Sequence, residues 1–272
     1  MHPTGPLTAH WFGPLGASAW RNHQGIWTSR RLRKGHGAIP SGRYQPTRFI
    51  SALKALMKTK SLARLDVRTA LAFIIGPLLF AIGSGLQLSN PEAPAAAGLL
   101  AIGSVFFTAG GWWQLRQAQQ VMHHLPDQMN GWLWCGLLCA ITQSLGTLLF
   151  NIDTFSVWIQ PNLDGTAWLL LVVMTNLMGS ILFLISAYFG LVEIGHGHLL
   201  SFEPDHFGWW INLFNTIGCL WFMQSALASL PSNPAKAMVI NSTMATQTTL
   251  LGALAFTLVG LISLAECSED EG

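Results

Sequence analysis

Six long stretches of the chain are apolar, and the segments between them are polar. The stretches cover residues 68–88, 97–115, 131–151, 167–192, 209–229 and 244–265, and none holds Lys or Arg beyond its first residue. The hydrocarbon core of a bilayer is about 30 Å thick and is crossed by about 20 residues of helix. The pattern therefore predicts an all-α protein, a polytopic membrane bundle of six transmembrane helices.

Each apolar stretch carries one copy of the same pattern, Gly-small-x-x-Phe. The glycine and phenylalanine of the six copies are Gly76 and Phe80, Gly103 and Phe107, Gly146 and Phe150, Gly179 and Phe183, Gly218 and Phe222, and Gly252 and Phe256. At 100° per residue these positions share one stripe of each helix. Small residues let membrane helices approach closely, so the stripe predicts helix packing. Lining of a cavity by the same stripe is the alternative.

The spacing of these glycines indicates a higher order of repetition. They are 27, 33 and 34 residues apart within successive pairs of stretches, and 43 and 39 residues apart between the pairs. This spacing predicts three similar helical hairpins in tandem, at 68–115, 131–192 and 209–265, within a membrane domain of residues 67–265.

Basic residues gather ahead of the first apolar stretch, where 12 of the 14 Lys and Arg precede Ala70. The positive-inside rule then predicts a cytoplasmic N-terminus. Six spans return the acidic tail, residues 266–272, to the same side. A chain with 51% hydrophobic and only 10% charged residues has the composition of a protein whose solvent is the lipid bilayer, here the plasma membrane.

The segment ahead of the first span divides into two parts. Residues 1–47 are rich in Pro, Gly, Arg and His without helical or strand periodicity, and are predicted to be disordered. Residues 48–66 begin with a short amphipathic stretch that is typical of a helix lying on an anionic membrane surface. Met57 is an alternative start, in which case residues 1–56 would not belong to the native protein.

Uncharged polar side chains interrupt the apolar stripe of the second and third hairpins. Gln143, Asn176 and Asn215 stand three residues before the glycine, and neighbouring spans add Asn212 and Gln247. Hydrogen bonding between helices is the favoured interpretation. The alternative is that these residues line a space for a small neutral or lipidic ligand. No ionisable residue lies at the predicted bilayer centre, which argues against ion or proton coupling.

Histidines in the predicted cytoplasmic loops are the candidate metal ligands, although their spacing matches no known ligand motif. They are His123, His124, His196, His198 and His206. Solvated interfacial histidines are the favoured interpretation, and no cofactor is expected.

Sequence motifs of catalysis or nucleic-acid binding are missing, so three functional classes stay open. The favoured one is a non-enzymatic structural or interaction protein, as a homo-oligomer or with a protein partner. A channel or carrier is the alternative, and a metal-dependent membrane enzyme is the least favoured class.

Two stretches resemble a known family. Residues 176–187, NLMGSILFLISA, and residues 209–222, WWINLFNTIGCLWF, are similar to YrhK-like membrane proteins, which carry a Gly-Ser-x-x-Phe signature in paired spans. The resemblance extends loosely over residues 68–265. It departs from Gly-Ser at Pro77, Thr147, Cys219 and Ala253. It implies a helical membrane fold, and no activity or catalytic residue comes with it.

Overall fold

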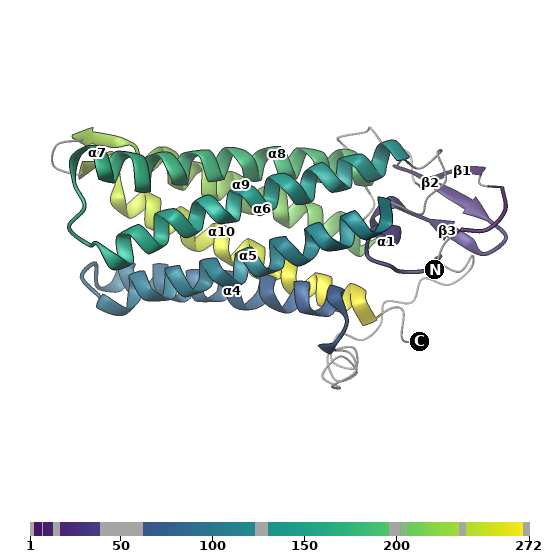
Figure 1. Ribbon diagram of the computed structural model, residues 1–272, viewed down its shortest axis with the longest axis horizontal. Coiled ribbons are helices and arrows are strands. Elements are labelled where there is room, and N and C mark those ends of the chain that lie inside the picture. Colours follow the sequence, from purple (N-terminus) through teal and green to yellow (C-terminus); the bar gives the residue numbers. More distant parts are fainter. Residues whose placement is uncertain are drawn as a thin grey trace.

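The computed structural model describes residues 3–6, 8–12, 17–38, 62–122, 130–195, 202, 204, 206–233 and 238–268. Long helices run side by side along its long axis (Figure 1). They are α4 (Leu65–Ser89), α5 (Pro94–Met122), α6 (Asn130–Ile159), α8 (Thr175–Gly195), α9 (Phe207–Ala228) and α10 (Ser242–Ser268). Two short elements continue α8 at its N-terminal end, α7 (Gly165–Trp168) and the π-helical η2 (Leu169–Met174).

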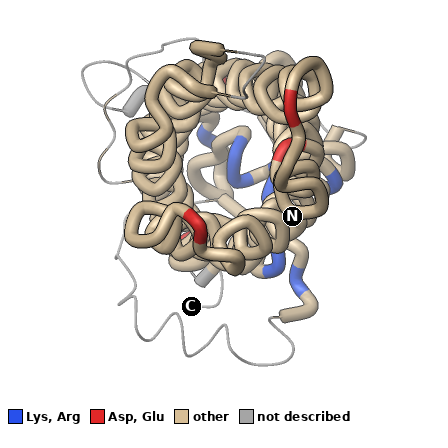
Figure 2. Tube along the Cα trace, turned by 90° about the vertical axis from the view of Figure 1, so that its left-hand side faces the viewer, with Lys and Arg blue, Asp and Glu red and all other residues tan. Residues whose placement is uncertain are grey.

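The long helices form a closed ring. Each packs on its neighbours in the order α4, α5, α6, α8, α9, α10, and α10 returns to pack along α4. Figure 2 shows this ring in the view along its axis. The first and last helices of the bundle are therefore neighbours, and all six face a common axis.

Five of these helices are long and apolar enough to cross a membrane, as judged over the described part of the chain. They are Leu65–Ser89, Pro94–Met122, Gly131–Ile159, Gly165–Gly195 and Ser242–Cys267. The prediction of a helical membrane bundle is confirmed in this form. Six spans were expected, but α9, with 22 residues, is not among the five. Its Trp, Asn and Gln side chains lower its mean hydropathy.

The outer surface of the ring is apolar, as lipid requires. Large side chains such as Leu78, Val105, Leu148 and Leu220 are exposed there. A bilayer offers these side chains an apolar solvent, whereas in water they would form an extensive hydrophobic patch. The exposed apolar side chains therefore agree with the hydropathy of the helices.

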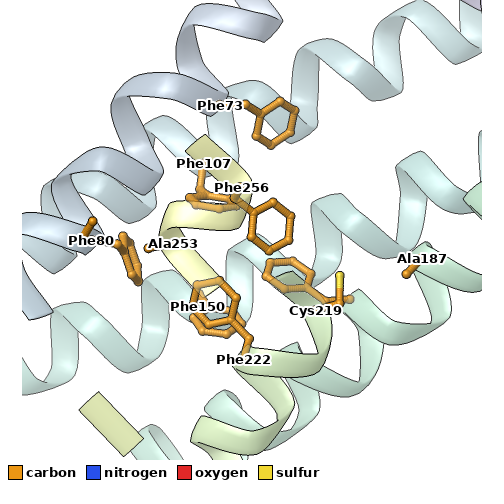
Figure 3. Close-up of a cluster of buried hydrophobic side chains, with 11 residues drawn as sticks. Phe73, Phe80, Phe107, Phe150, Ala187, Cys219, Phe222, Ala253 and Phe256 are labelled. Carbon is orange, nitrogen blue, oxygen red and sulfur yellow. The ribbon is translucent and has the colours of Figure 1, made fainter. Parts of the chain in front are cut away.

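The core lies on the axis of the ring (Figure 3), where the six phenylalanines of the repeat converge. They are Phe80, Phe107, Phe150, Phe183, Phe222 and Phe256, here called the Phe layer, and each is at most 6% exposed. Phe150 stacks on Phe183 with ring centroids 5.1 Å apart, and Phe107 meets Phe256 edge-on at 5.3 Å. Such contacts add to the stabilisation that comes from burial of the rings alone.

The six glycines of the repeat meet in pairs between adjacent helices. Gly76 faces Gly103, Gly146 faces Gly179, and Gly218 faces Gly252. A Cβ atom built on any of them would lie between 2.8 and 3.3 Å from the carbonyl oxygen of the paired glycine. These close approaches bring together α4 and α5, then α6 and α8, then α9 and α10.

A small N-terminal module covers one end of the ring. Its three-stranded antiparallel sheet has the order β1 (Thr8–Phe12), β2 (Ala17–Asn22), β3 (Gly25–Trp27), and α1 (Ser29–Arg33) follows. The described residues 17–38 make the contacts with the bundle that are used below. A second, two-stranded sheet of β4 (Pro231–Asn233) and β5 (Met238–Val239) lies at the other end.

This module differs from the expectation of a disordered segment over residues 1–47. Trp20 and Trp27 pair across β2 and β3 and pack with Leu32 against Val121 and Leu133 of the bundle. The segment is ordered by apolar contacts with residues about 100 positions away in the sequence. Local periodicity could not indicate these contacts. The tail also differs, since α10 continues to Ser268. The predicted interfacial stretch at 48–61 lies outside the described residues.

Candidate functional site

Two polar spaces lie on the axis of the ring, one on each side of the Phe layer. The first, here called the inner cavity, has a volume of about 60 Å³ and lies between α1 and the Phe layer. All six long helices contribute to its wall, with amide and hydroxyl groups from Gln114, Gln117, Gln143, Ser186, Asn212 and Asn215. At about 10 to 15 Å³ for each water, it has room for about four to six waters.

The second space, here called the outer cleft, lies at the end of the ring that carries β4 and β5. Its volume is about 230 Å³, and residues of all six long helices line it again. The polar members of its wall include Ser84, Asp153, Thr154, Asn176, Ser225, Ser242, Thr246 and Thr249. Ser225 and Thr249 join their hydroxyl groups at 2.7 Å, which ties α9 to α10 there.

The Phe layer separates the two spaces. Between Phe80, Phe107, Phe150, Phe183 and Phe222 the remaining void is only about 10 Å³. Thr147 is the other residue that lines this void, whose size is at the lower limit of about 10–15 Å³ that one ordered water needs. The axis is therefore polar, then apolar and closed, then polar again.

Buried ion pairs join the N-terminal module to the ring at the mouth of the inner cavity. Arg33 donates two hydrogen bonds to the carboxylate of Glu193 on α8, at 3.0 and 2.9 Å. Their side chains are 3% and 1% exposed. Gly136 of α6 leaves the space that the pair fills, because a Cβ atom there would collide with the Glu193 carboxylate. This fork-to-fork geometry is the strongest form of a charged pair.

The protonation of Arg33 follows from this contact. Burial alone would lower the pKa of the Arg33 guanidinium, but the Glu193 carboxylate more than offsets the burial. The pKa of Arg33 therefore lies above its ordinary value, and the guanidinium keeps its charge.

Two further carboxylates contact side chains of the module. Arg30 donates to both oxygens of Glu266 on α10, at 3.1 and 3.0 Å, and Lys34 pairs with the same carboxylate. Asp66 at the start of α4 lies 3.3 Å from the imidazole of His36. The module thus contacts one carboxylate on each of α4, α8 and α10.

Local sequence positions these side chains of the module. The hydroxyl of Thr28 accepts from the backbone amide of Arg31 and starts α1. Gly35 ends it with a positive φ of 78°, a conformation that glycine adopts without strain. The reversal turns His36 back toward the bundle, where its backbone amide donates to the carbonyl of Arg31 at 2.8 Å.

The polar residues predicted to line a ligand space are divided between the two spaces. Gln143, Asn212 and Asn215 line the inner cavity, whereas Asn176 lines the outer cleft. Gln247 is exposed on the surface of α10 and lines neither. They therefore do not converge on one space.

Of the histidines predicted as metal ligands, one lies among the described residues. His123, His124, His196 and His198 lie outside the described residues, and His206 flanks the start of α9. Sequence reasoning passed over Arg30, Arg33 and Glu266 as functional residues. The available signal was the density of Arg and Trp in a segment that was treated as disordered.

Comparison with known proteins returned no match to a family model, a curated protein or a solved structure. The resemblance to YrhK-like proteins stays a prediction.

Proposed function

We propose that α9 is a sixth span and that the membrane domain consists of three copies of one hairpin. The support for six spans is the ring itself, because α9 fills the place between α8 and α10 and has a length that crosses a hydrocarbon core. The support for triplication is that each hairpin repeats one contact, a pair of facing glycines, and that a phenylalanine ring lies over five of the six glycines, Gly76 being the exception. With six spans both termini are on one side, and the basic N-terminal segment makes that side the cytoplasm.

We further propose that the protein carries a small neutral polar solute across the membrane along the axis of the ring. The single observation behind this is the line of inner cavity, Phe layer and outer cleft, which draws on all six helices. A bundle that served only to pack or to bind a partner would have no need of buried amides on both sides of its apolar centre. The proposed function is therefore the carrier, which was the alternative from the sequence, and not the structural or interaction protein that the sequence favoured.

Besides the ion pairs of the inner mouth and the Asp153 carboxyl of the outer cleft, the polar groups of the proposed path are amides and hydroxyls. They donate and accept hydrogen bonds without charge, which suits a neutral solute with hydroxyl or amide groups. The cations of the module at the inner mouth are each in an ion pair, Arg30 and Lys34 with Glu266 and Arg33 with Glu193, so their charges are already engaged by carboxylates. In this proposal the Phe layer is the central barrier, and the docked N-terminal module closes the cytoplasmic mouth.

The Phe layer offers a direct test. The full chain is reconstituted in phospholipid vesicles, and glycerol entry is followed by stopped-flow light scattering. Phe150→Ala should admit glycerol at least tenfold faster than the wild type, which corresponds to about 1.4 kcal/mol of barrier. Phe155→Ala is the matched control, because Phe155 lies on the same helix but packs on Trp158 outside the Phe layer.

The variant must keep its fold for the comparison to count. Truncating a buried Phe costs about 3–5 kcal/mol, so Phe150→Leu is included as a smaller change that keeps more of the packing. Both variants should retain the helicity and elution volume of the wild type. A folded Phe150→Ala that admits glycerol no faster than Phe155→Ala would contradict the proposed path.

A further inference from the structure

Three possible metal ligands meet where the N-terminal module joins the first and last helices of the ring. His36 follows α1, Asp66 opens α4 and Cys267 ends α10. One donor atom from each, an imidazole nitrogen, a carboxylate oxygen and the thiol sulfur, lies within 4.8 Å of the other two. All three residues are buried, at 2%, 7% and 0% exposed. None of the histidines singled out in the sequence belongs to this group.

The donor set indicates the class of ion. Calcium and magnesium take oxygen ligands almost exclusively, whereas nitrogen with thiolate sulfur suits zinc and its neighbours in the first transition row. Around a tetrahedral zinc ion, donor atoms lie roughly 3.3–3.7 Å apart, given bonds of about 2.0–2.3 Å. The Nε2 of His36 and the Oδ2 of Asp66 are already 3.3 Å apart. The Cys267 sulfur lies within 4.8 Å of a donor atom of each of the other two residues.

The surroundings provide a second shell and a route of entry. Arg64 donates from Nε to Oδ1 of Asp66 at 3.1 Å and from Nη2 to the backbone carbonyl of Cys267 at 3.2 Å. These bonds hold two of the ligand-bearing segments together, as outer partners of metal ligands do. Nη2 of Arg64 also donates a hydrogen bond to Oδ2 of Asp66 at 2.6 Å. This bond would be released when Oδ2 binds the metal. A cleft of about 760 Å³, lined by His36, Asp66 and Gln120 among others, reaches the group.

We propose that His36, Asp66 and Cys267 bind one zinc-class divalent cation, with a water completing the tetrahedron. On binding, the Cys267 thiol releases its proton to solvent and the thiolate sulfur, the neutral His36 nitrogen and the Asp66 oxygen each form one bond to the metal. The ion bridges the module to α4 and α10. This site does not depend on the proposed transport, and it is tested without any measurement of flux.

The test uses Co²⁺ as a spectroscopic probe and Zn²⁺ as its competitor. The tag-free full chain, stripped of metal in lipid nanodiscs, is titrated with Co²⁺ while the thiolate-to-cobalt charge-transfer absorption is followed. The wild type should saturate at one Co²⁺ per chain, and Zn²⁺ should abolish the band. Cys267→Ser should lose the band, and His36→Gln should bind at least about tenfold more weakly. Cys135→Ser and His206→Gln are the matched controls and should behave as the wild type.

Thermal unfolding distinguishes a lost ligand from a lost fold. Without metal the variants should unfold close to the wild type, and Zn²⁺ should raise the midpoint of the wild type but not that of His36→Gln, because a ligand stabilises only the state that binds it. A wild type without the charge-transfer band would overturn the proposal. So would a band that persists in Cys267→Ser, since the sulfur would then come from another cysteine.

Discussion

At the scale of single residues, the molecule is defined by two kinds of close contact. Paired glycines let neighbouring backbones touch, and buried cations of the N-terminal module contact carboxylates of the ring. The glycines were visible in the sequence because their pattern is local to each helix. The ion pairs were not, because Arg33 and Glu193 are 160 residues apart and Arg30 and Glu266 are 236 apart.

Replacement of one paired glycine should weaken the bundle. A Cβ atom at Gly103 would lie 2.7 Å from a ring carbon of Phe80 and 2.8 Å from the carbonyl oxygen of Gly76, and the backbone contact cannot relax without moving α4. Gly103→Ala should therefore lower the free energy of unfolding by about 1–3 kcal/mol, the usual cost of overpacking. Denaturant titration of the protein in a lipid mimetic measures it. Gly85→Ala is the control, since a Cβ atom at Gly85 meets nothing within 4 Å.

The Arg33–Glu193 pair should show strong coupling. Arg33→Ala leaves a carboxylate buried without its partner, and the expected loss is about 3–5 kcal/mol of unfolding free energy. Arg33→Met combined with Glu193→Gln removes both charges and should recover most of that loss. The exposed Arg21 provides the control variant, Arg21→Ala, which should be neutral. Equal losses in the single and double variants would show that the charge pairing is not what holds the module.

At the scale of elements, the helices were predictable and the module was not. Apolar length predicted the long helices, and the glycine stripe predicted that their Phe side chains would pack. The strands of the module depend on the packing of Trp20 and Trp27 against Val121 and Leu133. No local sequence pattern indicates this contact. The π-helical turn at Leu169–Met174 likewise leaves no mark in the hydropathy. The polar residues of the stripe were found, but their division between two spaces depends on how the helices are arranged around the axis.

The status of α9 as a span has a topological test. If α9 crosses the membrane, the β4–β5 hairpin and the N-terminal module lie on opposite sides. Single cysteines are introduced into a background without native cysteines, as Asn233→Cys in β4 and Gln24→Cys in the module, both at exposed positions. A membrane-impermeant maleimide should label Asn233→Cys in intact cells, and Gln24→Cys only after permeabilisation. Labelling of both positions in intact cells would contradict the six-span arrangement.

At the scale of the whole molecule, the ring brings the stripes of the six helices together around one axis. Each helix contributes a Phe to the centre and residues to the wall of the space on either side of it, so the properties of the axis belong to no single element. The proposed transport therefore predicts that positions far apart along the axis act on the same flux.

Polar residues of both spaces should matter equally if solute passes along the axis. Gln143→Leu in the inner cavity and Asn176→Leu in the outer cleft each remove a hydrogen-bonding group worth about 1 kcal/mol, so each should slow flux roughly fivefold. Vesicle light scattering with glycerol, urea and other small neutral solutes provides the measurement. Gln247→Leu replaces an exposed amide outside both spaces and should leave the rate unchanged. An effect at Gln143 with none at Asn176 would confine the solute to one side.

The docking of the module on three different helices has a consequence in time. A ribosome makes Arg30 first, and its partner Glu266 is made 236 residues later. At about 5–20 residues per second, the partner emerges roughly 12–47 s after the arginine. The module can complete its contacts only after Glu266 has been made and α4, α8 and α10 stand together. Complete docking of the module would therefore show that the whole bundle has assembled. A chain truncated before Glu266 would be left with an open inner mouth.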